Sequence, residues 1–193
     1  MEHKLAVYLE QKIGDSKNRT ELDAAKMTYG LEIILNNFMK LLIIMLIGAC
    51  MGVFLETFCV FLGFGILRMY AGGVHCDTNK MCWISSIIVC VGNAYLAQYS
   101  LVSEVCGIVI AVVCVIIIEL YAPSGTRVNP IKECDRSIRK RNSLVIVLVY
   151  AVIAIIGWKM AFARALLYGT LTEAVTLLPI ANCKYNVNQN IVA

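Results

Sequence analysis

One polar stretch, broken by glycine, separates long apolar runs of this chain: Arg68-Met69-Tyr70-Ala71-Gly72-Gly73-Val74-His75-Cys76-Asp77-Thr78-Asn79-Lys80-Met81-Cys82. Polar groups close to a lipid bilayer must be hydrogen-bonded or face a cavity. A membrane chain therefore seldom carries a histidine, several thiols and an arginine in one short segment without a use. We expect the chemistry of this protein to reside here, and the pair of most interest is His75 and Cys82.

The composition predicts an all-α integral membrane protein. Hydrophobic residues make up 60% of the 193 residues, and charged residues are sparse and segregated. The length suits one membrane-embedded domain, residues 1–193, with about six spans of roughly 20 apolar residues each. The apolar runs cover approximately residues 33–55, 57–70, 82–99, 105–121, 144–158 and 161–180. Several are short for a span, and a re-entrant hairpin over residues 33–70 is the alternative to two spans.

The N-terminal segment, residues 1–30, is charged and amphipathic. Apolar residues recur in it at helical spacing, which predicts an amphipathic helix on the membrane surface: Leu5, Tyr8, Leu9 and Ile13. A second helical stretch runs from about Thr20 into the first span. Lysine and arginine are concentrated before this span and in the loop 122–142 after the fourth. The positive-inside rule therefore places both termini, the basic loop and the segment 68–82 in the cytoplasm.

A cysteine thiolate is a strong nucleophile, and a nearby imidazole can take the thiol proton and return it to a leaving amine. On one continuous helix, His75 and Cys82 would lie roughly 10 Å apart along the axis. We therefore expect a break between them. Gly72 and Gly73 allow the chain to fold back and bring His75 over the start of the next helix.

The residues before Cys82 favour a helix start. Asp77, Thr78 and Asn79 are all good N-cap residues. A helix that begins there holds Cys82 in its first turns, where unpaired N–H groups and the helix dipole favour a thiolate. The same three residues are also candidates to orient His75, and capping explains them equally well.

Two other uses of these residues remain open. Cys76 is the rival nucleophile, although adjacent side chains on an extended segment point apart. A metal site from His75, Cys76 and Cys82 lacks the usual spacing and an evident fourth ligand. A second function class is a non-enzymatic membrane transporter, or a thiol or metal sensor, that uses His75 and the cysteines. We predict no cofactor, no metal and no nucleic-acid partner.

The segment resembles the AgrB (accessory gene regulator B) family, the membrane cysteine endopeptidases that process autoinducing-peptide precursors in Gram-positive quorum sensing. The family pattern is an arginine, then Gly-Gly-x-His, then a cysteine seven residues after the histidine. In this chain the matching residues are Arg68, Gly72, Gly73, His75 and Cys82. A second landmark is met by Tyr121, Ala122, Pro123 and Pro130. The resemblance implies a catalytic pair of His75 and Cys82 in a multi-pass protein of the bacterial cell membrane.

The resemblance also implies a substrate: a precursor peptide with an amphipathic leader, an internal cysteine or serine and an acidic tail. Cleavage leaves the peptide on Cys82 as a thioester, and attack by the internal residue closes a thiolactone or lactone ring. Arg68 is a candidate to bind a carboxylate or to brace the loop. The basic loop is a candidate to bind membrane lipid or the acidic tail, through Arg127, Lys132, Arg136 and Arg139. A homodimer is an oligomeric state that the sequence leaves open.

Overall fold

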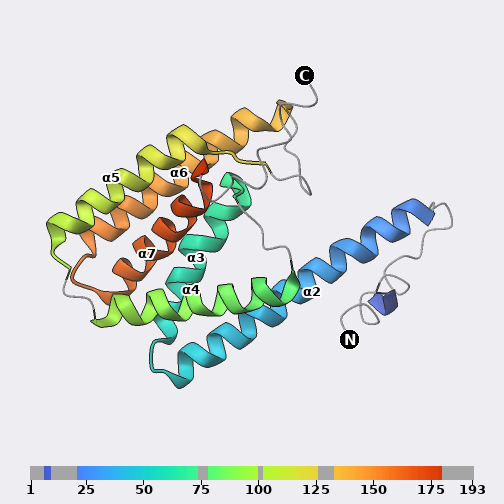
Figure 1. Ribbon diagram of the computed structural model, residues 1–193, viewed down its shortest axis with the longest axis horizontal. Helices are drawn as coiled ribbons and strands as arrows, with labels where there is room; N and C mark the ends of the chain where they lie inside the picture. Colours follow the sequence, from blue (N-terminus) through green and yellow to red (C-terminus); the bar gives the residue numbers. More distant parts are fainter. Residues whose placement is uncertain (1–6, 10–20, 74–77, 100–101, 126–132, 180–193) are drawn as a thin grey trace. The chain divides into compact units, whose positions relative to one another are not determined.

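The computed structural model describes residues 7–9, 21–73, 78–99, 102–125 and 133–179, and its regular elements there are helices (Figure 1). Beyond a short helical segment at residues 7–9, the helices are α2 (Glu21–Cys50), α3 (Phe54–Ala71), α4 (Asn79–Tyr99), α5 (Glu104–Tyr121), α6 (Glu133–Ile156) and α7 (Ala161–Leu177). The prediction of an all-α protein is confirmed. Three of the six apolar runs lie within one helix each, and the runs 144–158 and 161–180 extend a few residues past the ends of α6 and α7. The first run, 33–55, continues past the end of α2 into the start of α3.

Four helices in the described part of the chain are long and apolar enough to cross a membrane: residues Leu22–Cys50, Phe54–Ala71, Lys80–Tyr99 and Glu104–Tyr121. The α6 helix begins with charged residues, and α7 has only 17 residues. The first four spans of the expected six therefore have matching helices, including both spans of region 33–70. Spans formed by α6 and α7 stay a prediction.

The chain divides into two compact units, residues 1–45 and 46–193. The first unit contains most of α2, which starts where the sequence predicts and exposes apolar side chains such as Leu22, Ile34 and Phe38. The predicted amphipathic helix before it lies largely outside the described residues. The second unit contains the end of α2 and helices α3 to α7. Whether the two units act as one domain stays a prediction.

The α7 helix forms the centre of the second unit. Ten of its 17 residues are buried, whereas only four residues of the more apolar α5 are buried. It packs against α3, α4, α5 and α6. Glycines permit its closest contact, because a methyl group at Gly169 would lie 2.5 Å from the Val60 carbonyl oxygen, and one at Gly63 would lie 2.5 Å from that of Leu166. Small residues at such crossings let two helix backbones approach closely.

The predicted basic loop, residues 122–142, is shorter than expected. Its first boundary is correct, since α5 ends at Tyr121 before the extended Ala122. Its second boundary is wrong, since α6 already begins at Glu133. The acidic residues of the first turn of α6 favour its positive N-terminal end. In addition, Lys140 Nζ lies 3.1 Å from Glu119 Oε1 and joins the N-terminal half of α6 to the end of α5.

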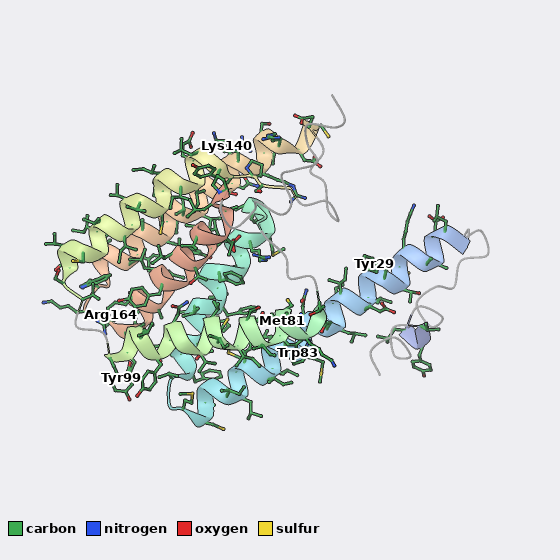
Figure 2. All side chains as sticks on the ribbon, in the orientation of Figure 1. Tyr29, Met81, Trp83, Tyr99, Lys140 and Arg164 are labelled. Atoms are coloured by element: carbon green, nitrogen blue, oxygen red, sulfur yellow. The ribbon has the colours of Figure 1, made fainter. Side chains whose placement is uncertain are left out.

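The joints of the second unit gather at two opposite ends. Figure 2 places Arg164 and Tyr99 at one end and Lys140 at the other. At the first end, Arg164 Nε donates to the Ala97 carbonyl at 3.0 Å, and Arg164 Nη1 donates to that of Trp158 at 2.8 Å. The end of α3, the end of α5 and the start of α6 lie together at the second end. The side of the membrane that each end faces stays a prediction.

Candidate active site

The end of α3 is fixed by the segment that follows α5. Gly73 N–H donates to the Ser124 carbonyl at 3.2 Å, and Ser124 N–H donates to the Ala71 carbonyl at 2.8 Å. These bonds form an isolated parallel bridge between Gly72 and Ser124. The two sequence landmarks, fifty residues apart in the chain, are therefore in direct backbone contact. Nothing in the local pattern of either landmark signals this pairing.

The bridge requires glycine at both positions of the Gly-Gly pair. Gly72 has φ 79° and Gly73 has φ 107°, conformations that residues with a side chain rarely adopt. A methyl group at Gly72 would also collide with the Ser124 carbonyl oxygen. The backbone conformation at the end of α3 therefore depends on these two glycines.

Beneath Gly73 lies an ion pair between α3 and α7. Arg68 Nη1 donates to Glu173 Oε2 at 3.3 Å. The Glu173 side chain is fully buried, and that of Arg68 is one quarter exposed. The Arg68 guanidinium also lies over the Phe64 ring, 5.3 Å from its centroid. Arg68 thus joins α3 to α7 through its contact with Glu173.

The start of α4 has the capping geometry that the sequence predicts. Thr78 Oγ1 accepts a hydrogen bond from Met81 N–H at 3.3 Å, and the Thr78 carbonyl accepts one from Cys82 N–H at 3.1 Å. Cys82 is half-buried in the first turn. Two hydroxyl groups, Ser85 Oγ and Ser86 Oγ, donate to the Cys82 carbonyl at 3.1 and 2.7 Å. Thr78 therefore serves as a helix cap.

Several predicted site residues lie outside the described residues: His75, Cys76, Asp77, Arg127, Lys132 and the side chain of Asn79. Of the basic residues that are described, Arg136 lies 3.8 Å from Glu133 in an exposed pair. Arg139 Nη1 donates to the Met69 carbonyl at 3.2 Å and so ties α6 to the end of α3. A role of these arginines in binding a peptide tail stays a prediction.

The structure brings together the end of α3, the end of α7 and the segment after α5. Arg68, Gly73 and Glu173 meet at this point. Figure 1 shows the start of α4, which carries Cys82, set apart from these helix ends. The segment 74–77, with His75 at its second position, links the two places along the chain. The prediction that His75 and Cys82 form a pair is therefore not tested by the described residues.

Comparison with known proteins gives one consistent match. The family model described as "Accessory gene regulator B" matches residues 2–177. The accessory gene regulator protein B of Staphylococcus saprophyticus is 29% identical over 163 residues, which cover 84% of this chain and 86% of that protein. The protein of the same name from Staphylococcus aureus is 28% identical over 177 residues, 91% of both chains. Protein FsrB of Enterococcus faecalis is 28% identical over 154 residues, 79% of this chain and 63% of that protein. No solved structure matches the chain significantly.

Proposed function

Because the chain belongs to the AgrB family, whose membership implies the processing of autoinducing peptides in quorum sensing, we propose that it is a cysteine endopeptidase with Cys82 as nucleophile and His75 as base. It removes the C-terminal tail of a precursor peptide and closes the remaining peptide into a ring. The observation that carries the proposal is the position of Cys82 in the capped first turn of α4, directly after the segment with His75, in a chain of this family.

The first step is acyl transfer to the enzyme. His75 takes the proton of the Cys82 thiol, and the sulfur attacks the carbonyl carbon at the processing site. The C–N bond to the tail breaks, and His75 gives its proton to the departing amine. The peptide core is then held on Cys82 as a thioester.

The second step decides the product. An internal cysteine of the substrate loses its proton to His75 and attacks the thioester. The bond to the Cys82 sulfur breaks as the thiolactone forms, and His75 returns the proton to that sulfur. An internal serine gives a lactone by the same path. Water competes for the same thioester, so ring closure requires a cavity from which water is largely excluded.

The basic surface around the start of α6 is the proposed contact for the acidic tail or for anionic lipid. Among the basic residues of this surface, Arg136 is exposed, and its ion pair with Glu133 is weak because both side chains are exposed to solvent. With six spans and both termini in the cytoplasm, this surface and the site face the compartment in which the precursor is made.

The test is cleavage of the cognate precursor by purified enzyme in lipid. Cys82→Ala abolishes cleavage because it removes the group that carries the acyl intermediate. Cys76→Ala is the matched control, a cysteine-to-alanine change in the same segment, and it retains much of the activity. Equal loss in both variants would contradict the choice of nucleophile, and full activity of Cys82→Ala would contradict the proposed mechanism.

A further inference from the structure

The C-terminal end of α3 takes hydrogen-bond donors from two other segments. The helix ends at Ala71, and the carbonyls of residues 69–71 have no donor within the helix itself. Ser124 N–H donates to the Ala71 carbonyl at 2.8 Å, and Arg139 Nη1 donates to the Met69 carbonyl at 3.2 Å. The end of α3 is therefore capped in part by a side chain of α6.

Arg139 is held at this end by the packing of α6. Its backbone carbonyl accepts a hydrogen bond from Ser143 Oγ at 2.9 Å, and Ser143 is fully buried. One turn further along α6, Val147 lies in a buried cluster that includes Leu67 and Ala71 of α3. The Arg139 side chain thus extends from a part of α6 that packs against the helix it caps. Its positive charge also suits the negative C-terminal end of that helix.

The neighbouring arginines of α6 have different surroundings. Arg136 is exposed, and its guanidinium lies 3.8 Å from the exposed Glu133. Arg141 is exposed as well. Arg139 is instead half-buried, and its guanidinium is bonded to the backbone of another helix. A guanidinium engaged in this way is a poorer contact for an acidic peptide than an exposed one.

The capped end of α3 leads into the segment of the proposed catalytic residues. Met69 precedes the Gly-Gly pair by three residues, and only residues 74–77 separate that pair from Thr78, the cap of α4. The proposed nucleophile, Cys82, lies in the first turn of α4. A displacement of about 1 Å in an active site can lower the rate of a reaction about 10²-fold. The cap on α3 therefore bears on catalysis as well as on stability.

We propose that Arg139 is a positioning residue for the cleavage reaction. By capping the Met69 carbonyl, it holds the end of α3, and with it the Gly-Gly pair, against Ser124. The inference rests on the proposed function, since it gives the end of α3 a role in the reaction of Cys82. Arg139 touches neither the precursor peptide nor the reacting sulfur. Contact with an acidic tail falls to exposed cations such as Arg136.

The first measurement needs no substrate. Hydrogen exchange of the full-length protein in lipid is followed by mass spectrometry on peptides that cover Gly72 and Gly73, whose N–H groups donate to the Arg68 and Ser124 carbonyls. Arg139→Ala raises the exchange rate of these amides about tenfold, because it loosens the end of α3. Arg139→Lys raises it less than about threefold, because an ammonium group still donates to a single carbonyl. Unchanged exchange in Arg139→Ala, or an equal increase in both variants, would overturn the proposal.

The second measurement is the effect on kcat and KM for cleavage of the precursor. Arg139→Ala lowers kcat about tenfold and leaves KM within about twofold, because it disturbs the site and not the contact with the tail. The loss is the same with a precursor whose acidic tail residues are replaced by the corresponding amides. A rise in KM that disappears with this neutral tail would show that Arg139 binds the tail, and it would overturn the proposal.

Two other arginine-to-alanine variants are the matched controls. Arg141→Ala removes an exposed arginine from the same part of α6, and it leaves kcat and the exchange of the Gly-Gly pair within about twofold of the wild type. Arg164→Ala removes an arginine that also donates to backbone carbonyls, but at the opposite end of the unit (Figure 2). It lowers stability without raising exchange at the Gly-Gly pair. An equal rise in exchange in Arg164→Ala would indicate general loosening of the protein and would overturn the proposal.

The outcomes separate this inference from the proposed function. If Cys82→Ala is inactive while Arg139→Ala cleaves at the full rate, only the role of Arg139 is wrong. If Cys82→Ala cleaves, the proposed function itself is wrong, and the exchange measurement still decides whether Arg139 caps α3.

Discussion

Replacing Gly72 by alanine tests whether the bridge between α3 and the segment after α5 shapes the site. Gly72 has φ 79°, and an added methyl group would collide with the Ser124 carbonyl oxygen. A side chain in the left-handed region costs about 1–2 kcal/mol. The collision also breaks the two hydrogen bonds of the bridge, each with a net contribution of about 0.5–1.5 kcal/mol. We therefore expect Gly72→Ala to destabilise this region by about 2–5 kcal/mol.

The assay has two readouts on protein purified in detergent: thermal unfolding followed by tryptophan fluorescence, and cleavage of the precursor. Gly92→Ala is the control, because Gly92 lies within α4 and nothing lies within 4 Å of a methyl group built there. Alanine exceeds glycine in helix propensity by about 1 kcal/mol, so this variant is at least as stable as the wild type. Gly72→Ala unfolds at lower temperature and cleaves more slowly. If both variants match the wild type in unfolding and in cleavage, the bridge has no role in the site.

Three further predictions concern other contacts of the second unit. Arg164→Ala lowers the unfolding temperature, since it removes charged hydrogen bonds to three backbone carbonyls, and a hydrogen bond to a charged group contributes about 1.5–3 kcal/mol. Arg164→Lys restores little, because an ammonium group cannot reproduce the guanidinium fork, and full recovery would contradict the geometry. Asn93→Leu removes the 2.8 Å hydrogen bond from the Asn93 amide to the Thr172 hydroxyl and lowers the free energy of unfolding by only about 0.6 kcal/mol. A loss of several kcal/mol in thermal unfolding would indicate a larger polar network. The exposed Cys134 reacts with a membrane-impermeant maleimide in inside-out vesicles and not in intact cells; labelling from outside would invert the topology.

The sequence predicts the helices and the break between them because these features are local. Apolar runs locate α3 to α7, and glycines with a following N-cap residue locate the turn after α3 and the start of α4. The predicted loop 122–142 ends too late, since α6 begins at Glu133 and the charged residues after Glu133 suit an exposed loop and an exposed helix equally well. Local pattern is therefore enough for the elements and uncertain at their polar ends.

The contacts that build the site are not local, and the sequence does not reveal them. Arg68 and Glu173 are 105 residues apart, and neither residue carries a sign of its partner. The bridge between Gly72 and Ser124 is a backbone contact, so no side-chain pattern encodes it. Only the packing of α3, α5 and α7 brings these groups together.

Mass spectrometry of the intact enzyme tests the central claim, acyl transfer through Cys82, most directly. A precursor without its ring-forming residue is incubated with purified enzyme in lipid, so that the second step cannot occur. We predict an adduct with the mass of the precursor minus its tail, located on Cys82, released by hydroxylamine, and absent in Cys82→Ala. Added tail peptide reduces the adduct because the first step is reversible. Hydrolysis of this substrate at the full rate without an adduct, or an adduct on Cys76, would contradict the account.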